Sequence, residues 1–555
     1  MNKVTRLLGS EIVVRCFEEQ ACTHIFGYPG GAVIPLFDAF YRLDHSMMQV
    51  EPSHEQNGVH AADGYARASG KVGVAITTSG PGATNAVTGI ANAYLDSVPL
   101  VVITGQVATT LLGKDSFQEV DITSITRPIT KHNFIVKDVT MLAPTIREAF
   151  RIAASGRPGP VVIDIPKDIL LAETDYTPMV GNGHEYYYPK PQHDAVVRAA
   201  EYINQAERPV IYAGGGVLKS HASKELVELA EKAGIPIANS LMGLGSIPRD
   251  NPLSLGFVGM HGSTETNLAV INCDTLIAIG SRFSDRVTGN INEFMREKKI
   301  IHIDVDPSEF EKNIEANVHI CADIKEVLPK LTQIVNEASH QEWRNQIAQW
   351  PKPDNRPKDA YTPKNIISNI NNTFGDAYVV TEVGQHQMWM GQYWRFKFPG
   401  QYITSGGLGT MGFGLGAAIG TQLAQPEKEV VLIAGDGSFR MNFQELITVK
   451  KYKLPIKIFL FDNQTLGMVR QWQKLFNGAR YAQTDLDDHA VDYRKLADAF
   501  DIKNYDVGSL EDIKKVLKEV KNINEPVLIH INIPKDEGVY PIVPAGKPID
   551  EVYYG

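Results

Sequence analysis

Short apolar runs, rich in β-branched residues, alternate with amphipathic stretches along most of the chain. The nine clearest runs fall into three groups of three, at 72–78, 100–105 and 160–166, at 209–216, 275–281 and 300–306, and at 429–437, 455–463 and 526–533. Runs that are apolar throughout are typical of strands buried on both faces of a parallel sheet. The pattern therefore predicts an α/β protein whose sheets carry helices on both faces.

Two proline-rich stretches interrupt this alternation, at residues 175–193 and 349–363. Clustered prolines disfavour both helices and strand pairing, so we interpret the two stretches as linkers. They divide the chain into three doubly wound parallel-sheet domains, expected over residues 1–175, 194–340 and 364–555. The length of 555 residues agrees with this division, because it is too long for a single hydrophobic core.

Composition and charge exclude several classes of function. The net charge is −10 and no basic stripe is present, which argues against nucleic acid or an anionic membrane surface as the main partner. No apolar stretch reaches the roughly 18 residues that a membrane span needs.

The four cysteines (Cys16, Cys22, Cys273 and Cys321) lack metal-ligand spacing and are interpreted as small core residues in a reducing compartment. The first residues lead directly into a helical pattern, so we expect no leader and a cytoplasmic protein.

Polar residues follow two apolar runs of the last domain. The run 429–437 delivers Gly435, Asp436, Gly437 and Ser438, and the run 455–463 ends in Asp462 and Asn463. Ligands of parallel sheets bind beyond the carboxyl ends of the strands, where glycines let the backbone approach a diphosphate and side-chain oxygens can bind Mg²⁺. Either sequence alone is more simply a tight turn. The intervening residues 438–461 suffice for one helix and one strand, so it is the pair that indicates a site.

This pair resembles the signature of thiamine diphosphate-dependent enzymes, although Asp462 stands where the family has its first asparagine. The resemblance implies that Mg²⁺ is bound by Asp436, Asn463 and the backbone carbonyl of Thr465. Met411, in the glycine-rich stretch 406–412, would wedge between the two rings of the cofactor, although alone it is equally a core methionine. Further cofactor contacts are implied for Val383, Gly384, Gln385, His386, Gly409, Gly435, Gly437, Ser438, Gly467 and Met468.

Glu55 lies in the sequence Ser53-His54-Glu55-Gln56, just before an expected helix over 60–70. Ser53 and Gln56 fit a capping box, in which Glu55 would be a solvated first-turn residue. The same stretch resembles the segment that carries the activating glutamate of thiamine enzymes acting on 2-oxo acids. That carboxylate would hydrogen-bond the aminopyrimidine ring and favour loss of the thiazolium C2 proton. In the family it reaches a cofactor on a second chain, which implies a homodimer or homotetramer with active sites between subunits.

Over nearly its whole length the chain resembles the acetolactate synthases, from 26–32 through 78–85 to 466–473 and 539–546. The last two stretches resemble the type that serves branched-chain amino-acid (isoleucine and valine) biosynthesis. The resemblance implies that Gly31 faces the thiazolium, that Phe117 and Gln118 lie beside the cofactor-bound substrate, and that Lys167 adds positive charge near a substrate carboxylate. Trp472 would shape the pocket for the second 2-oxo acid. Alone, Lys167 is more simply a surface residue and Trp472 a core residue.

The middle domain resembles the FAD-binding domain of the same family, with Ser284 where Asp is commoner. Arg282 and Arg286 could neutralise a pyrophosphate, and glycine turns admit its close approach. Because the net reaction is not a redox change, FAD would be structural, and a degenerate nucleotide domain kept as a scaffold is the alternative. The implied FAD contacts are Arg157, Gly214, Gly215, Gly216, Ser240, Leu241, Met260, His261, Gly280, Arg282, Asp285, Arg286, Asp304, Val305 and Asp323.

The implied reaction decarboxylates pyruvate and joins the remaining two carbons to a second 2-oxo acid. Pyruvate or 2-oxobutanoate as the acceptor would give 2-acetolactate or 2-aceto-2-hydroxybutanoate, and a regulatory small subunit is a possible partner. A pyruvate oxidase-like flavoenzyme is the nearest alternative. A regulatory or scaffold protein without catalysis is a second, against which the presence of Glu55, Asp436 and Asn463 counts.

Overall fold

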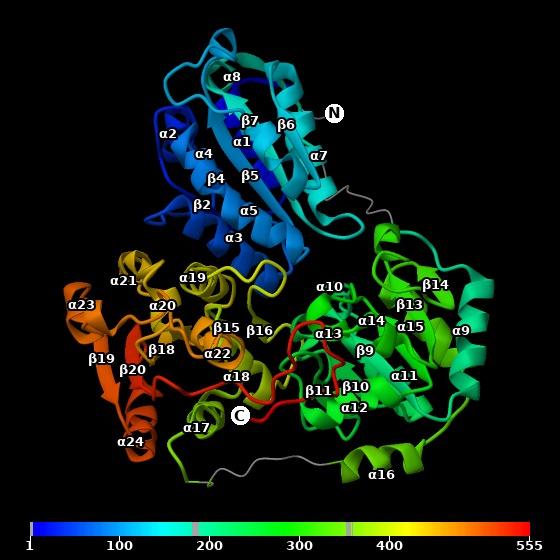
Figure 1. Ribbon diagram of the computed structural model, residues 1–555. Helices are drawn as coiled ribbons and strands as arrows, with labels where there is room; N and C mark the ends of the chain where they lie inside the picture. The colour runs from blue at the N-terminus through cyan, green and yellow to red at the C-terminus, as the bar shows by residue number, and fades with distance from the viewer. Residues whose placement is uncertain (1–3, 180–187, 351–356, 358) are drawn as a thin grey trace.

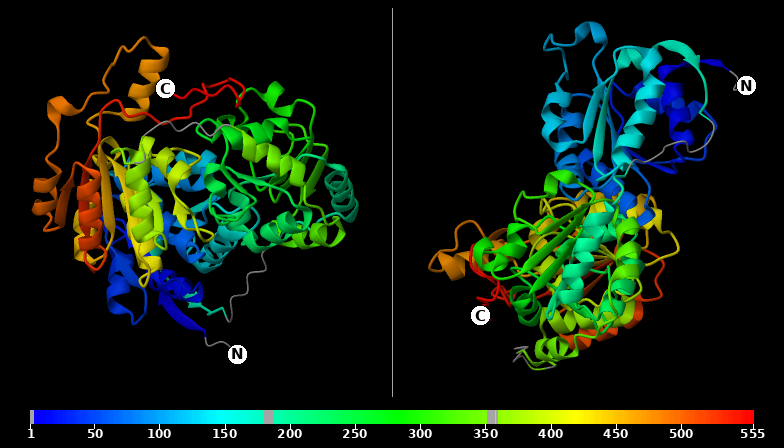
Figure 2. Two further views of the ribbon diagram at one scale, coloured as in Figure 1. Left: turned by 90° about the horizontal axis from the view of Figure 1, so that it is seen from below. Right: turned by 90° about the vertical axis from the view of Figure 1, so that its right-hand side faces the viewer.

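The computed structural model describes residues 4–179, 188–350, 357 and 359–555, so part of each expected linker lies outside the described residues. The described chain contains three six-stranded parallel sheets with helices on both faces, which confirms the expected α/β class (Figure 1). Each of the nine apolar runs carries one strand of these sheets. The N-terminal domain stands above the other two domains in Figure 1 and in the right-hand view of Figure 2.

In the N-terminal sheet the strand order is β3-β2-β4-β5-β7-β6. Helices α1 (Gly9–Glu19), α2 (Ile34–Arg42) and α7 (Leu142–Ala154) share one apolar core on one face, and α3 (Glu55–Ser69) and α5 (Val87–Leu95) bury their apolar residues in another. The strands are β2 (His24–Gly27), β3 (Met48–Val50), β4 (Gly73–Thr77), β5 (Leu100–Gln106), β6 (His132–Ile135) and β7 (Pro160–Pro166). A two-stranded antiparallel ribbon joins β1 (Thr5–Leu8) to β8 (Glu173–Tyr176).

The middle sheet has the order β11-β10-β9-β12-β13-β14, which reverses at β9. Its strands are β9 (Pro209–Ala213), β10 (Ile237–Asn239), β11 (Ser254–Phe257), β12 (Thr275–Ile279), β13 (Lys299–Asp304) and β14 (Val318–Cys321). Its larger core joins α9 (His193–Gln205), α11 (Ser223–Ala233) and α15 (Ile324–Ile334) to the sheet. On the other face α12 (Thr264–Asn272) and α16 (Gln341–Gln349) contribute to a second core.

The C-terminal sheet, β16-β15-β17-β18-β20-β19, repeats the order of the N-terminal sheet when each set is numbered from its own first strand. Its strands are β15 (Tyr378–Thr381), β16 (Tyr402–Ile403), β17 (Val430–Gly435), β18 (Lys457–Asp462), β19 (Lys503–Val507) and β20 (Val527–Asn532). One core contains α17 (Pro363–Phe374), α18 (Gln385–Tyr393) and α24 (Leu510–Val520). The chain after β20 then crosses to the middle domain, where Val543 N donates to Met260 O at 2.8 Å (Figure 1).

The two outer domains share one apolar core where α3 packs on α19 (Gly414–Ala424). Two glycines allow this close crossing: a Cβ at Gly64 would overlap the carbonyl of Ala417, and one at Gly420 would overlap the carbonyl of Ala61. The beginning of α3, where Glu55 lies, is therefore fixed against the C-terminal domain of the same chain.

The expected capping box at the start of α3 is wrong. The helix begins at Glu55 rather than at residue 60, and its N-cap is His54, whose ring nitrogen accepts from Gln56 N at 3.1 Å. Ser53 instead donates its backbone N–H to Glu445, because it belongs to the contact between the outer domains. All four cysteines are free, and Cys16 and Cys273 are buried. Among the described residues, no helix has both the length and the apolar character needed to cross a bilayer.

Candidate functional site

Asp436 is the most unusual residue at the end of β17. Asp436 is the first residue of the short helix α20 (Asp436–Phe439) and is only 2% exposed. One carboxylate oxygen, Oδ2, has no hydrogen-bond partner among the described residues. Burial, and then the nearby Asp462, raise the pKa of Asp436 to about 8. An unpaired buried carboxylate oxygen is costly, and a hard divalent cation is the ligand that best compensates it, so this site fits Mg²⁺.

Asn463 follows β18, which is paired in parallel with β17, so the two predicted ligands stand at neighbouring strand ends. Asn463 Nδ2 donates to Gln385 Oε1 at 3.1 Å, and its Oδ1 accepts a 3.3 Å bond from the N–H of buried Thr465. This hydrogen bonding fixes the orientation of the amide and leaves its oxygen as the group that can face a cation.

Asp462, the departure from the family pattern, is matched by a histidine on the next strand. His530 of β20 donates from Nε2 to Asp462 Oδ2 at 2.8 Å, and its Nδ1 lies 2.8 Å from Asp506 Oδ1. Although burial opposes it, hydrogen bonds to the two carboxylates raise the pKa of His530. A histidine held in this way can offset the charge of a carboxylate at the position where the family has an amide.

The first turn of α18 lies against Gly435, next to Asp436. The ring of His386 lies against Gly435, where a Cβ would be 2.7 Å from Nδ1, so a larger residue at 435 would displace it. His386 Nε2 is buried without a partner among the described residues, and burial lowers the pKa of this ring to about 3. Gln385 donates to Gln471 at 3.1 Å and to the Glu537 carbonyl at 2.8 Å. These bonds connect the start of α18 to the C-terminal segment.

Met411 lies above this site in the glycine-rich stretch 406–412. Its terminal methyl is 3.8 Å from the position of a Cβ on Gly437. Buried Glu382, at the end of β15, accepts from Gly412 N at 2.9 Å and Gly414 N at 2.8 Å. Burial raises the pKa of Glu382 to about 7. Glu382 thus anchors the residues that follow Met411.

Glu55 is half-buried and faces a second group of predicted residues. Asn85 Nδ2 donates to Glu55 Oε2 at 2.9 Å, and a Cβ at Gly82 would be 3.1 Å from Oε1. Gln118 joins this group, because its carbonyl would be 2.8 Å from a Cβ at Gly80. Gly31 borders open space, with no atom within 4 Å of its Cβ position. These glycines keep the space beside the carboxylate open.

The segment of Glu55 meets the Met411 stretch within one polypeptide. Gln56 Nε2 is 3.9 Å from the Cβ position of Gly412, and His54 N donates to Glu445 at 3.0 Å. The resemblance assigns the corresponding contact to a second chain, whereas here the neighbour belongs to the same chain. Phe117, 87% exposed, and the exposed Lys167 at the start of α8 (Lys167–Leu171) are not brought against the metal-ligand candidates in this structure.

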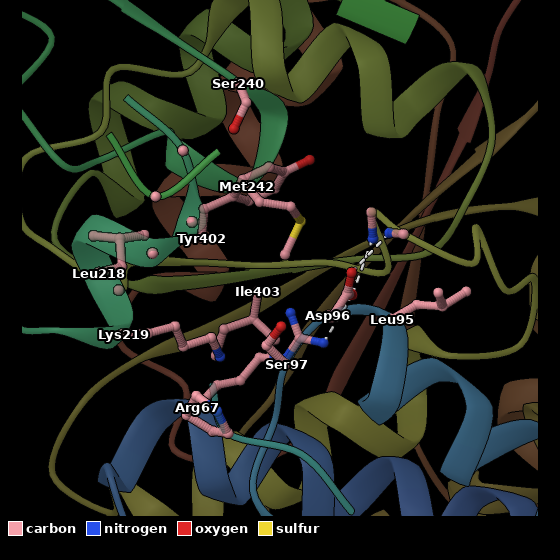
Figure 3. Close-up of a pocket in the computed structure, with 18 of the residues that line it drawn as sticks. Arg67, Leu95, Asp96, Ser97, Leu218, Lys219, Ser240, Met242, Tyr402 and Ile403 are labelled. Carbon is pink, nitrogen blue, oxygen red and sulfur yellow. Dashed lines mark hydrogen bonds and ion pairs between the residues drawn. The ribbon is translucent and has the colours of Figure 1, made fainter. Parts of the chain in front are cut away.

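A cavity of about 1530 Å³ lies where the three domains meet (Figure 3). It exceeds the roughly 300–1,000 Å³ typical of a pocket for one small ligand. All residues of the predicted FAD set line it, from Arg157 to Asp323. So do Val383, Gly384, Gly409, Met468 and Trp472 of the predicted thiamine and substrate set. The cavity therefore joins the predicted FAD set to these five residues, whereas Glu55, Asp436 and Asn463 do not line it.

Two polar groups distinguish this cavity from a packed interface. His261 Nδ1 is buried without a partner among the described residues, and burial lowers the pKa of this ring to about 4. Arg157 is already paired with Asp306 at 3.2 Å and with Glu309 at 2.6 Å, so it joins the N-terminal and middle domains. An unpaired buried nitrogen and polar glycine turns fit a bound dinucleotide.

The sequence analysis missed several residues that line the cavity. They are Gln387, Met388, Gly406, Gly407 and Glu309. The first four lie inside stretches that were recognised, so their neighbourhood was the available signal. Glu309 offered none, because its role depends on Arg157 reaching it from another domain.

Comparison with known proteins agrees with this arrangement. Residues 8–125 match the N-terminal TPP binding domain of thiamine pyrophosphate enzymes, residues 196–331 the central domain, and residues 382–531 the C-terminal TPP binding domain. A probable acetolactate synthase large subunit of Methanocaldococcus jannaschii is 46% identical over 97% of this chain and 94% of its own length. The acetolactate synthase isozyme 2 large subunit of Escherichia coli K12 is 44% identical, over 98% of this chain and 99% of its own. An acetolactate synthase of Arthrospira platensis is 41% identical, over 98% and 97% respectively. The chain belongs to the acetolactate synthase large-subunit family of thiamine pyrophosphate enzymes.

Proposed function

We propose that this chain is the catalytic subunit of an acetolactate synthase that uses thiamine diphosphate and Mg²⁺. The observation that carries the proposal is the unpaired, buried Oδ2 of Asp436 at the strand end next to Asn463. Buried carboxylate oxygens without a partner among the described residues also occur on Glu225, Asp274 and Glu309. Only at Asp436 does a neighbouring strand end supply a second candidate ligand, Asn463, for a cation. Asp436, Asn463 and the Thr465 carbonyl would hold that cation, and the glycines of 435–437 would admit the diphosphate.

The residues of this chain divide the chemistry between them. Thiamine diphosphate, when bound, supplies the nucleophilic carbon and the electron sink for decarboxylation. Glu55 would hold a proton beside the aminopyrimidine ring, and the amide of Asn85 orients its carboxylate. Gly31 and Gln118 would border the substrate, while Lys167 and Phe117 would reach it from the exposed face. Water must be excluded, because the two-carbon unit left by decarboxylation would leave as an aldehyde if it took up a proton before meeting the second 2-oxo acid.

Trp472 would decide the choice of the second 2-oxo acid. Its indole lies on α22 (Gly467–Phe476) and lines the cavity beside Met468. A flat apolar wall discriminates by contact with a methyl group, and one methylene is worth about 1–3 kcal/mol in such a pocket. We expect 2-oxobutanoate to compete well against pyruvate at this wall, giving 2-aceto-2-hydroxybutanoate beside 2-acetolactate.

FAD would occupy the part of the cavity lined by the middle domain. The support is the set of glycine turns around Gly214 and Gly280 with the unpaired His261 Nδ1. Arg282 and Arg286 would face the pyrophosphate, and Arg157 would serve mainly as the cross-domain ion pair that shapes one wall. Bound flavin would be seen directly as absorbance near 450 nm after release from the purified protein.

The decisive experiment supplies pyruvate to the purified chain with thiamine diphosphate and Mg²⁺. Formation of 2-acetolactate, detected as acetoin after acid treatment, supports the proposal. Acetate with hydrogen peroxide would instead assign a pyruvate oxidase-like activity, an alternative already disfavoured by relatives named acetolactate synthase. No consumption of pyruvate under these conditions would favour a scaffold role.

We also propose a homodimer or homotetramer, and a regulatory small subunit because relatives are named large subunits. Large apolar side chains on the N-terminal domain support a second copy, since Phe117 is 87% exposed and Ile34 57% exposed. Mixing two inactive variants, Glu55→Gln and Asp436→Asn, tests where the active site is built. Sites between chains restore up to about a quarter of the activity of an equal mixture, because about half of the dimers are mixed and each of these has one intact site of two; sites within one chain restore none.

A further inference from the structure

A buried ionic cluster of the N-terminal domain faces the Met411 stretch. Arg67 of α3 forms ion pairs with Asp63 at 2.5 Å and with Asp96 at 3.0 Å, and these three side chains are at most 7% exposed. Asn92 of α5 donates to Asp63 at 3.1 Å and completes the cluster. Lys219, on α10 (Gly215–Lys219) of the middle domain, points toward the same region (Figure 3). Such a cluster is weak evidence for stability, because desolvation offsets much of its attraction.

The contacts of this cluster indicate a different role. Asp96, which ends α5, accepts from the backbone N–H of Gly406 at 3.1 Å and of Gly407 at 2.7 Å (Figure 3). Arg67 also donates to the carbonyl of Thr404 at 3.0 Å. A carboxylate that accepts two consecutive backbone N–H groups fixes the direction of that backbone. The cluster thus holds the beginning of the Met411 stretch.

Asn92 holds the next part of the stretch. Its Oδ1 accepts from Ser405 Oγ at 2.6 Å and from Thr410 Oγ1 at 3.2 Å. Ser405 Oγ in turn accepts from Thr410 N at 2.9 Å. On the far side of Met411, Glu382 holds Gly412 and Gly414. Met411 is therefore anchored on one side by its own domain and on the other by the N-terminal domain.

We propose that Asp96 and Asn92 are positioning residues, which hold the Met411 stretch in the shape that supports the bent cofactor. This inference rests on the proposed function. It implies that the placement of Met411 depends on docking of an N-terminal domain, so that the cofactor meets an ordered support only once the outer domains are in contact. The charge of Asp96 matters because an amide offers one acceptor oxygen where the loop presents two N–H groups.

The test is Asp96→Asn in the full chain, compared with Glu19→Gln. Glu19 is the matched control, because it is another carboxylate of the same domain that pairs with an arginine (Arg147, 2.8 Å) and accepts a backbone N–H (Met179, 2.8 Å). Amide hydrogen exchange of the peptide covering 404–413 is measured without cofactor. With cofactor, kcat is measured from steady-state turnover of pyruvate. The exchange rate of the thiamine C2 proton is measured by rapid quench followed by NMR.

We expect Asp96→Asn to speed exchange of this peptide at least fivefold, because the loop loses hydrogen bonds to a charged acceptor. It should lower kcat about 10- to 100-fold, since a shift of about 1 Å in a positioned group has that effect. Glu19→Gln should change neither quantity. Equal exchange and equal kcat in Asp96→Asn and the parent would overturn the proposal.

Two further outcomes are distinguishable. If Asp96→Asn does not fold, Ser405→Ala removes the shorter of the two bonds that Asn92 accepts from the loop, together with the bond from Thr410 N to Ser405. Faster exchange of peptide 404–413 in this variant carries the same conclusion, and unchanged exchange overturns it. If the parent chain has no activity with pyruvate, the proposed function fails, while the exchange experiment still decides whether the cluster orders the stretch.

Discussion

The N-terminal and C-terminal domains share one strand order but carry different chemistry at equivalent places. In the N-terminal sheet, edge strand β3 is followed by α3, whose first residue is Glu55. In the C-terminal sheet, the equivalent edge strand β16 is followed by the Met411 stretch and then by α19. The two equivalent helices pack on each other, so a carboxylate and an apolar support reach the contact between the domains from opposite sides.

The same contrast holds after the next strand along the chain, which is β4 in the N-terminal domain and β17 in the C-terminal domain. Beyond β4 the chain offers the glycines of 78–85 and no charged side chain, whereas beyond β17 it offers Asp436. One topology thus places the proposed metal ligands in one copy and small residues beside the proposed catalytic carboxylate, Glu55, in the other. Function is set by the residues that follow the strands rather than by the fold itself.

The largest effect is expected where the two copies differ most, at Asp436. Asp436→Asn removes the carboxylate that the cation compensates, and we expect Mg²⁺-dependent cofactor affinity to fall about 100-fold or more. Titration of cofactor binding against Mg²⁺ by tryptophan fluorescence measures this loss. The neighbouring Asp462→Asn should keep its dependence on Mg²⁺, because the position is not a predicted ligand. Equal loss in both variants would contradict the assignment of ligands.

On the N-terminal side of the contact, the expected effect is on the rate rather than on cofactor affinity. Glu55→Gln keeps the hydrogen-bonding shape but cannot hold the proton, so kcat should fall about 10²- to 10⁴-fold. Cofactor affinity should stay within about threefold of the parent, because the diphosphate is held by the other domain. Steady-state kinetics with pyruvate, set beside an exposed control, Glu51→Gln, measures the difference. A large loss of affinity with unchanged kcat would assign Glu55 to binding.

The sequence analysis predicted strands well and inter-domain contacts poorly. Runs such as 160–166 coincide with a strand because a strand buried on both faces leaves an uninterrupted apolar record. The capping box at Ser53 failed because Glu445, some 390 residues away, takes up its backbone N–H. The anchoring of Gly406 and Gly407 by Asp96 leaves no local pattern either. Groups that act across domains are set by packing, which no short stretch records.

A third prediction concerns specificity rather than rate. Trp472→Leu shortens the wall that the cavity presents to the second 2-oxo acid, and we expect the preference for 2-oxobutanoate over pyruvate to fall about tenfold. The ratio of the two products formed in competition measures it directly. Phe476→Leu is the control, because that ring packs at a tilt against Trp472, with 5.1 Å between the ring centroids, but does not line the cavity. An unchanged ratio in Trp472→Leu would exclude the indole as the selective wall.

The smallest effect concerns a buried acid that the N-terminal sheet carries on β7. Asp164 accepts from Thr104 at 2.7 Å and from Gln106 at 3.0 Å, yet burial dominates and raises its pKa to about 7. Between the ordinary pKa of 3.8 and about 7, the unfolded chain is ionised while the folded chain holds a proton. The free energy of unfolding therefore falls as pH rises through this interval and levels off above it.

Asp164→Asn cannot titrate, so its stability should depend less on pH than that of the parent. Between pH 5 and pH 8 we expect the parent to lose about 1–3 kcal/mol more than the variant in the local opening energy of β5 and β7. Hydrogen exchange of peptides from these strands, corrected for intrinsic rates, measures it. In the C-terminal sheet the equivalent strand β20 should respond to pH alike in both proteins, because its buried His530 is untouched. Parallel pH curves for β7 in the two proteins would mean that Asp164 is already ionised in the fold, stabilised by Thr104 and Gln106.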